Sequence, residues 1–221
     1  MPNWVFNTVT VSGGYKYVLE VKQVMSQPVP VMKMKPGSAW EAVQGDWDME
    51  ETDFSFWNVV SPPVDRWGEY FTGENWYNWN ITNWGCKWDA KADYESGSSL
   101  EGEYLNEEYP RNELVYRIET AWSPPVAFIE KMAERFPMCQ IELAYEEEQG
   151  WGGELIYDAG QIVSDSEYDI PGSHSDYMER GRDCNFCEWG EPAFDCPGYE
   201  ELTAEDSQTK LKAEAKETAS E

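Results

Sequence analysis

The residues best suited to metal chemistry lie toward the carboxyl end of the chain. Two residues separate Cys184 from Cys187, and Cys196 follows them. His174 is the only histidine in the sequence. A C-x2-C turn directs two thiolates at one zinc ion, and a third cysteine with a histidine completes a tetrahedral site. Without a second histidine, we expect a structural zinc ion rather than a catalytic one. The alternative is reduced thiols in a loop, with Cys187 packed beside Trp189.

A second candidate site combines tryptophans with polar side chains over residues 83–89. Two indoles beside a lysine and an asparagine can line a ligand cleft or stack on the bases of a single strand. In the structural alternative, which we favour, Trp84 and Trp88 belong to the core, Lys87 pairs with an acid and Asn83 caps a helix. The candidate binding residues are Asn83, Trp84, Lys87, Trp88, Asp89, Trp122, Glu148 and Trp151.

Acid–base and nucleophilic chemistry find little support. Glu146, Glu147 and Glu148, with Glu154, could supply paired carboxylates, but three adjacent acids are most often a solvated run. A single histidine makes a Ser-His-Asp or Cys-His arrangement unconvincing. The glycine-rich stretch over 150–153 lacks the lysine and hydroxyl residue of a phosphate loop. We therefore predict no catalytic residues, and a protein that is not an enzyme.

Charge excludes whole classes of partner. The 221 residues include 16 Lys and Arg against 43 Asp and Glu, so the formal net charge is −27. Such a chain offers few cations for non-specific nucleic-acid binding, and an anionic membrane surface repels it. Residues 199–221 hold seven acids and three bases, so most of the charge belongs to the rest of the chain. The 12 Trp, 13 Tyr and 8 Phe argue against a disordered acidic protein.

The compartment follows from segments that the sequence lacks. No stretch approaches the ~20 apolar residues of a membrane helix. The start of the chain has neither the basic region nor the apolar run of a secretory signal. Five cysteines, an odd number, do not form a disulfide framework. We expect a reducing cytoplasm, where clustered cysteines indicate metal more than disulfides.

Two strand–helix–strand patterns must position these residues, which predicts an α+β fold: a split β-α-β sandwich with two helices on one face of an antiparallel sheet. The first has a strand over 3–12 and a helix over 15–25; Val18, Val21 and Met25 share one helical face. The second has a strand over 114–122, a helix after a Ser123 N-cap, and a strand over 139–145. The apolar stripe of that second helix comprises Val126, Ile129, Met132, Ala133 and Phe136.

The remaining segments give weaker patterns. We predict one ferredoxin-like domain with long loops over 1–164, a Cys- and His-containing extension over 165–198, and a disordered or frayed helical tail over 199–221. We expect residues 26–53 to be mostly loop and residues 54–60 to form a strand. A helix over 74–84 should end at Gly85, followed by an edge strand over 86–90 and a loop over 91–112. A hairpin should form around Asp158-Ala159-Gly160.

Several motifs follow one another in a fixed order over residues 1–164. They are Met1-Pro2-Asn3-Trp4-Val5, a Phe-rich segment ending in Pro62-Pro63, Asn83-Trp84-Gly85-Cys86-Lys87-Trp88-Asp89-Ala90, Thr120-Ala121-Trp122-Ser123-Pro124-Pro125, and Tyr145-Glu146-Glu147-Glu148 before Gly150. This series resembles the YubB-type ferredoxin-like family of bacteriophages and conjugative plasmids. Two features depart from that family: Cys86 stands where it usually carries Thr, and the 26–53 loop is long. The resemblance implies a ferredoxin-like α+β domain inside an infected or plasmid-bearing bacterium. It implies no activity and no catalytic residue.

Two functions of different classes remain. The first is a non-enzymatic accessory protein that binds a host macromolecule with a basic surface, in its sharpest form an acidic nucleic-acid mimic that inhibits a host defence protein or nuclease. Plain solubility is the competing explanation of the charge. The second is a small module whose aromatic cleft binds a ligand or single-stranded nucleic acid.

Overall fold

The computed structural model describes residues 3–37, 42–63, 76–90 and 99–169 of the chain. The chain divides into two units, Met1–Tyr168 and Asp169–Glu221, and the account below concerns the first. Its elements are β1 (Trp4–Gly13), α1 (Tyr15–Met25), β2 (Val29–Met34), β3 (Ala42–Glu50), the 3-10 helix η1 (Phe56–Asn58), α3 (Trp76–Asn83), β4 (Ser99–Tyr104), β5 (Asn112–Ala121), α4 (Val126–Arg135), β6 (Cys139–Glu147), β7 (Trp151–Asp158) and β8 (Gln161–Asp169).

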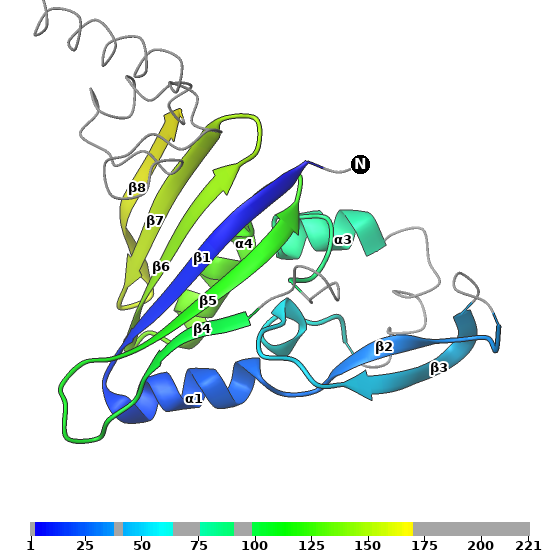
Figure 1. Cartoon of the computed structure of the whole chain (residues 1–221), viewed down its shortest axis with the longest axis horizontal. Coiled ribbons are helices and arrows are strands. Elements are labelled where there is room, and N and C mark those ends of the chain that lie inside the picture. Colours follow the sequence, from blue (N-terminus) through cyan, green and yellow to red (C-terminus); the bar gives the residue numbers. More distant parts are fainter. Residues whose placement is uncertain (1–2, 38–41, 64–75, 91–98, 170–221) are drawn as a thin grey trace, which may run out of the picture. The chain divides into compact units, whose positions relative to one another are not determined.

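The main sheet has six strands in the order β4-β5-β1-β6-β7-β8 (Figure 1). Pairings β4–β5, β5–β1, β1–β6 and β6–β7 are antiparallel. Strand β5 lies between β1 and β4, and β1 lies between β5 and β6, so two β-α-β units are each split by a strand of the other. This arrangement confirms the predicted split β-α-β sandwich, which β7 and β8 extend at one edge.

Both long helices belong to one hydrophobic core. Helix α1 buries Val18, Val21 and Met25, as its apolar spacing predicted. Helix α4 buries Phe128, Ile129, Met132 and Ala133, and Figure 1 shows it behind the sheet. On the strands, alternate residues point to the same core, for example Val5, Val9 and Val11 of β1. The sheet therefore has a helix-covered face and an opposite face, here called the open face.

Four segments differ from the sequence prediction. Residues 26–53, expected to be mostly loop, contain β2 and β3, which form a separate two-stranded antiparallel sheet. Residues 54–60 do not form a strand, because the chain there turns through η1. Residues 86–90 form bends instead of an edge strand. The expected loop over 91–112 contains β4, which pairs with β5.

The start of α4 also differs in detail. Its N-cap residue is Pro125, and no side chain accepts a capping hydrogen bond there. The hydroxyl of Ser123, expected to cap this helix, instead donates to the carbonyl of Gly85 at 2.6 Å. Val126 is 36% exposed, so the buried stripe of α4 begins at Phe128 instead. Among the described residues, no helix is long and apolar enough to cross a membrane.

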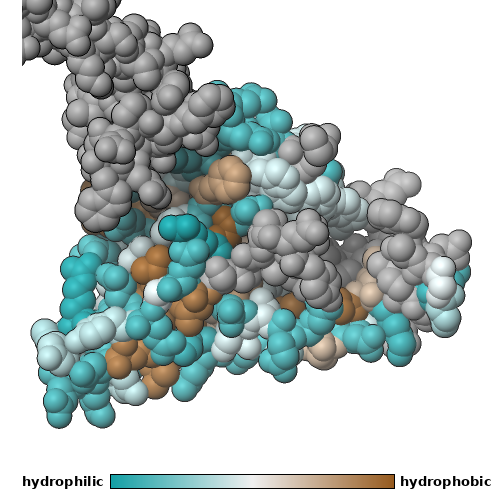
Figure 2. Space-filling model, in the orientation of Figure 1, coloured by the Kyte–Doolittle hydropathy of each residue, from teal (hydrophilic) through white to brown (hydrophobic). Residues whose placement is uncertain are grey.

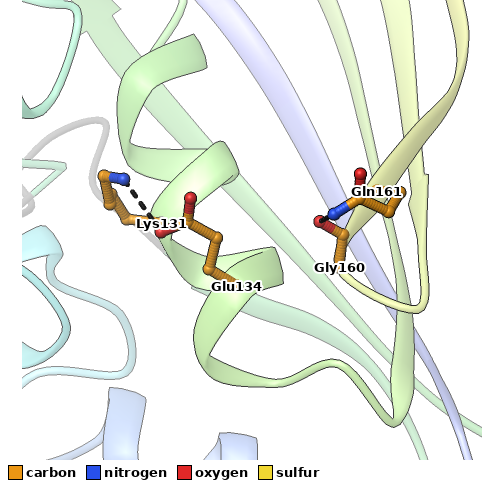
Figure 3. A network of polar contacts seen from close by, with 4 residues as sticks. All are labelled: Lys131, Glu134, Gly160 and Gln161. Carbon is orange, nitrogen blue, oxygen red and sulfur yellow. Dashed lines mark hydrogen bonds and ion pairs between the residues drawn. The ribbon is translucent and has the colours of Figure 1, made fainter.

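The hairpin predicted around Asp158-Ala159-Gly160 is confirmed between β7 and β8. Ala159 and Gly160 have φ of 50° and 72°, as a type I′ turn requires. Gly160 lies against the end of α4, since a Cβ there would be 3.3 Å from the carbonyl oxygen of Ala133. Figure 3 shows this turn, where the side chain of Gln161 donates to the Gly160 carbonyl, beside α4 with its Lys131–Glu134 ion pair of 2.8 Å.

Replacing Ala159 by glycine should raise the free energy of unfolding by about 1 kcal/mol, because only glycine adopts a positive φ without steric cost. Urea denaturation followed by tryptophan fluorescence measures the change. The matched control is Ala127→Gly within α4, which should lower the same free energy by about 1 kcal/mol. Equal losses in both variants would contradict the turn assignment.

Candidate functional site

The loop that follows α3 is fixed by the burial of Trp84. Only 1% of this side chain is exposed. Its indole Nε1 donates to the carbonyl of Val60 at 2.8 Å, and its own carbonyl accepts the backbone N–H of Phe128 at 3.2 Å. Its ring packs on those of Phe56 and Trp79, with centroids 5.7 and 5.2 Å away. Trp84 was a candidate binding residue, but the favoured alternative, in which Trp84 belongs to the core, is confirmed.

Gly85 joins two of the sequence motifs. Its φ of +86° is the left-handed conformation that ends α3, as expected from its position. A Cβ at Gly85 would lie 3.1 Å from the backbone nitrogen of Ala127 and 3.2 Å from that of Val126. With the hydrogen bond from Ser123 to the Gly85 carbonyl, this close approach holds the 83–90 segment against the turn after β5.

Asp89 and Asn83 have structural roles as well. The Asp89 carboxylate accepts hydrogen bonds from the Ser55 hydroxyl at 2.6 Å and from the backbone N–H of Phe56 at 2.7 Å. Desolvation raises the pKa of this carboxyl group, although these hydrogen bonds oppose the rise. The Asn83 side chain donates to the Trp79 carbonyl at 2.8 Å, in the last turn of α3. Both predicted binding residues are therefore corrected to residues that fix the local backbone.

Lys87, Trp88 and Trp122 come together at the surface. The ammonium nitrogen of Lys87 lies 4.3 Å from the centroid of the Trp88 ring and 5.0 Å from that of Trp122. Trp88 is 39% exposed and Trp122 is 54% exposed, so neither belongs to the core. The sequence singled out this trio, and the structure brings it together. The favoured alternative, a buried Trp88 and a Lys87 paired with an acid, is wrong.

The backbone of Trp122 is strained. Its φ of 79° lies in the left-handed region, which costs a side-chain-bearing residue about 1–2 kcal/mol. The conformation is fixed from both sides: the Trp122 N–H donates to the Asn3 carbonyl at 2.9 Å, and the Thr120 hydroxyl donates to the Ser123 carbonyl at 2.8 Å. Strain held in this way is typical of functional sites.

Glu148 and Trp151 lie at the same end of the sheet. The Glu148 carboxylate accepts the backbone N–H of Trp4 at 2.9 Å. The ring of Trp4 lies 6.2 Å from that of Trp88, centroid to centroid, which links Glu148 to the trio. Trp151 packs edge to face on Tyr145, with a centroid separation of 5.9 Å. Trp4 is thus a residue of this surface that sequence reasoning missed, although its place at the start of β1 opposite Ala121 of β5 marks it.

The open face of the sheet carries most of its charge as carboxylates. Strand alternation places there Phe6, Thr8 and Thr10 of β1, together with side chains of β5, β6 and β7. Figure 2 shows hydrophilic side chains over this side of the molecule, with separate hydrophobic ones between them. The glutamates of the open face are Glu113 and Glu119 of β5, Glu142 and Glu146 of β6, and Glu154 of β7.

Few cations balance these glutamates. Arg117 is paired with Glu101 at 2.7 Å, and Arg111 lies beside Ser12 and Gln140 at the edge of the face. Desolvation and then the charges of Glu154 and Glu113 raise the pKa of Glu142, while Arg111 opposes the rise. Adjacent like charges on a sheet destabilise it. Sequence reasoning considered Glu146 and Glu154 but missed their clustering with Glu113, Glu119 and Glu142, which the even spacing of the glutamates in β5 and β6 could have indicated.

The proposed metal ligands His174, Cys184, Cys187 and Cys196 lie outside the described residues. The zinc site therefore stays a prediction. In the part of the chain that is described, no group of three or more His, Cys, Asp or Glu side chains is arranged to hold a metal ion. Two other cysteines, Cys86 and Cys139, are buried free thiols there. Burial raises the pKa of both thiols, which makes them poor nucleophiles.

Comparison with known proteins supports the architecture. A family model described as a ferredoxin-like domain in Api92-like protein matches residues 84–183. The fold is ferredoxin-like. The crystal structure of the protein Api92 from Yersinia pseudotuberculosis is similar to this chain with a TM-score of 0.51 and 12% sequence identity, over 77% of this chain and 99% of that one. No curated protein matches this ferredoxin-like chain.

Replacing Trp122 by glycine tests whether the strained residue serves stability. Trp122→Gly removes the left-handed penalty of about 1–2 kcal/mol and an indole that is half exposed. We expect its free energy of unfolding to equal or exceed that of the wild type, whereas Trp122→Ala keeps the strain and should be less stable than the glycine variant by about 1 kcal/mol. Urea denaturation decides. A glycine variant less stable than the alanine variant would contradict the strain.

Metal analysis tests the predicted zinc site. The purified full-length protein should contain about one zinc ion per chain, and Cys184→Ser should lose most of it because one of four ligands is gone. Cys139→Ala, a cysteine outside the proposed set, is the control and should keep the metal. Absence of stoichiometric zinc, together with one melting temperature before and after chelation, would rule the site out.

Proposed function

We propose that this protein is a non-enzymatic accessory factor that binds a basic surface of a host macromolecule through the open face of its sheet. In the sharpest form of the proposal, it mimics a nucleic acid and inhibits a host nuclease or defence protein. The resemblance of its motifs to a bacteriophage and plasmid family supports the cytoplasm of an infected or plasmid-bearing bacterium as the setting. Similarity to Api92 concerns the fold and adds nothing about activity.

One observation carries the proposal: five glutamates share the open face with two arginines. A basic nucleic-acid groove recognises phosphates mainly by charge, so a rigid array of carboxylates can compete for it. The lysines of the long helices, by contrast, are interspersed with acids, as in the Lys131–Glu134 pair. Solubility alone requires net charge and gives no reason to gather it on one face.

The crowding of these charges adds a physical argument. Desolvation raises the pKa of Glu142, and the nearby charges of Glu154 and Glu113 add to the rise against the opposing effect of Arg111. A face selected for stability alone would alternate the sign of its charges across neighbouring strands. A cationic partner removes the repulsion when it binds, so part of its affinity comes from relief of this unfavourable interaction.

The alternative function is a small module that binds a ligand or single-stranded nucleic acid through aromatic side chains. The exposure of Trp88 and Trp122 on either side of Lys87 favours a binding role for that surface. Its nucleic-acid form has to overcome a net charge of −27 with one local lysine. We therefore place the acidic face first.

Neutralising the open face should abolish partner binding. The triple variant Glu113→Gln, Glu142→Gln, Glu154→Gln removes three charges from the open face and relieves their repulsion, so it should fold at least as stably as the wild type. As bait in a bacterial lysate at low salt, the wild type should retain a basic protein that duplex DNA or high salt elutes. The triple variant should not retain it.

The matched control removes three exposed glutamates elsewhere. Glu20 on α1, Glu107 after β4 and Glu130 on α4, each changed to Gln, give the same net charge but leave the open face intact. This control should retain the same basic protein. Retention of that protein by the open-face variant, loss from both variants alike, or resistance to duplex DNA would contradict the proposal.

A further inference from the structure

We propose that Trp88 and Trp122 form a clamp for a guanidinium group, that Lys87 occupies this clamp as an internal ligand, and that an arginine side chain of a partner protein displaces it. We call these two residues the Trp clamp. The inference concerns residues outside the open face, so it can hold or fail independently of the function proposed above.

The geometry of the Trp clamp is that of a cation site. The Lys87 ammonium lies within about 6 Å of both ring centroids, at 4.3 Å from Trp88 and 5.0 Å from Trp122, the range in which cations are attracted to an aromatic face. Two indoles thus face one positive charge. Both rings are open to solvent at their outer parts, 39% and 54% exposed, so a second molecule can reach them.

A hydrogen bond fixes the backbone of Lys87, whereas its ammonium group has no carboxylate partner among the described residues. Its carbonyl accepts a hydrogen bond of 2.8 Å from the side chain of Asn80, so α3 fixes where the residue lies. Lys22 and Lys131 are ion-paired with glutamates, whereas no carboxylate of the described residues lies within 4.0 Å of the Lys87 ammonium. Its flexible stem can therefore swing away without breaking an ion pair.

An arginine suits the vacated space better than the lysine that leaves it. A guanidinium is planar, weakly hydrated and stacks on aromatic faces, whereas an ammonium is a compact and strongly hydrated charge. The hydrogen bonds that hold Trp122 at its strained φ of 79° leave its indole exposed beside Lys87.

The negative charge of the protein favours binding of a cation over binding of an anion at this end of the sheet. The chain carries a net charge of −27, and Glu148 lies next to Trp4, whose ring neighbours that of Trp88. This field attracts an arginine-containing segment and repels a nucleotide phosphate. The occupant is therefore an arginine side chain of a basic protein.

The test uses N-acetyl-arginine amide and its uncharged analogue N-acetyl-citrulline amide, at physiological salt, with the indole N–H resonances of tryptophan-labelled protein as the readout. In the variant Lys87→Met the resident cation is gone, and the arginine compound should bind about fivefold more tightly than to the wild type. The shifts should be confined to Trp88, Trp122 and Trp4. Citrulline amide should give no such shifts.

Two further variants separate the Trp clamp from general charge. Lys16→Met removes the same charge from α1, where Lys16 lies over Tyr17 at 4.5 Å, and should leave arginine binding at the wild-type level. Adding Trp122→Gly to Lys87→Met should abolish the gain. Dispersed spectra confirm that each variant is folded.

Several outcomes would overturn the inference. They are an affinity of Lys87→Met no higher than that of Lys16→Met, equal binding of citrulline amide, or retention of the gain without the Trp122 indole. Stronger shifts of the same indoles by a single-stranded oligonucleotide than by the arginine compound would overturn it too, in favour of a nucleic-acid site. The open-face variant of Glu113, Glu142 and Glu154 should bind the arginine compound as the wild type does, whether or not it retains a protein partner.

Discussion

The contact between Gly85 and the first residues of α4 sets the position of everything at the aromatic end of this protein. The close approach leaves no room for a Cβ, and the Ser123 hydroxyl donates to the Gly85 carbonyl beside it. Trp84 anchors one side of this contact in the core, through its hydrogen bond to Val60. Because Lys87 and Trp88 follow Gly85 and Trp122 precedes Ser123, this one contact brings two distant motifs to a common surface. A larger residue at Gly85 would separate them.

Sequence periodicity predicted the elements that carry their own apolar signal. The helices α1 and α4 and the strands β1, β5 and β6 follow directly from the spacing of their buried residues. Segments decided by tertiary contacts could not be predicted in this way. Phe54 and Phe56 alternate as in a strand, yet Asp89 accepts the N–H of Phe56 from a distant part of the chain and favours the turn η1. Strand β4 is largely polar and exists because β5 pairs with it.

The candidate binding residues also fall into two groups, those buried in the structure and those that meet at its surface. Trp84 and Asp89 sit at positions where a buried ring and a buried carboxylate complete hydrogen bonds of the backbone, and composition cannot distinguish such residues from ligand-binding ones. Lys87, Trp88 and Trp122 meet at the surface only because the Gly85 contact exists. Glu113, Glu119 and Glu142 of the open face escaped notice because each is unremarkable alone. Their proximity comes from the register of β5, β1, β6 and β7.

Two features of the described surface reduce stability and have no explanation in the packing of the core. Trp122 adopts a left-handed backbone while exposing a ring that burial would otherwise favour, and desolvation and the charges of Glu154 and Glu113 raise the pKa of Glu142 more than Arg111 lowers it. Folding alone would place glycine at the first position and fewer carboxylates around the second. Both features become favourable in the same circumstance, which is contact with a positively charged partner: the indole gains a guanidinium to stack on, and the carboxylates gain counter-charges. The cost to the free protein is thus the physical reason to regard both surfaces as binding surfaces.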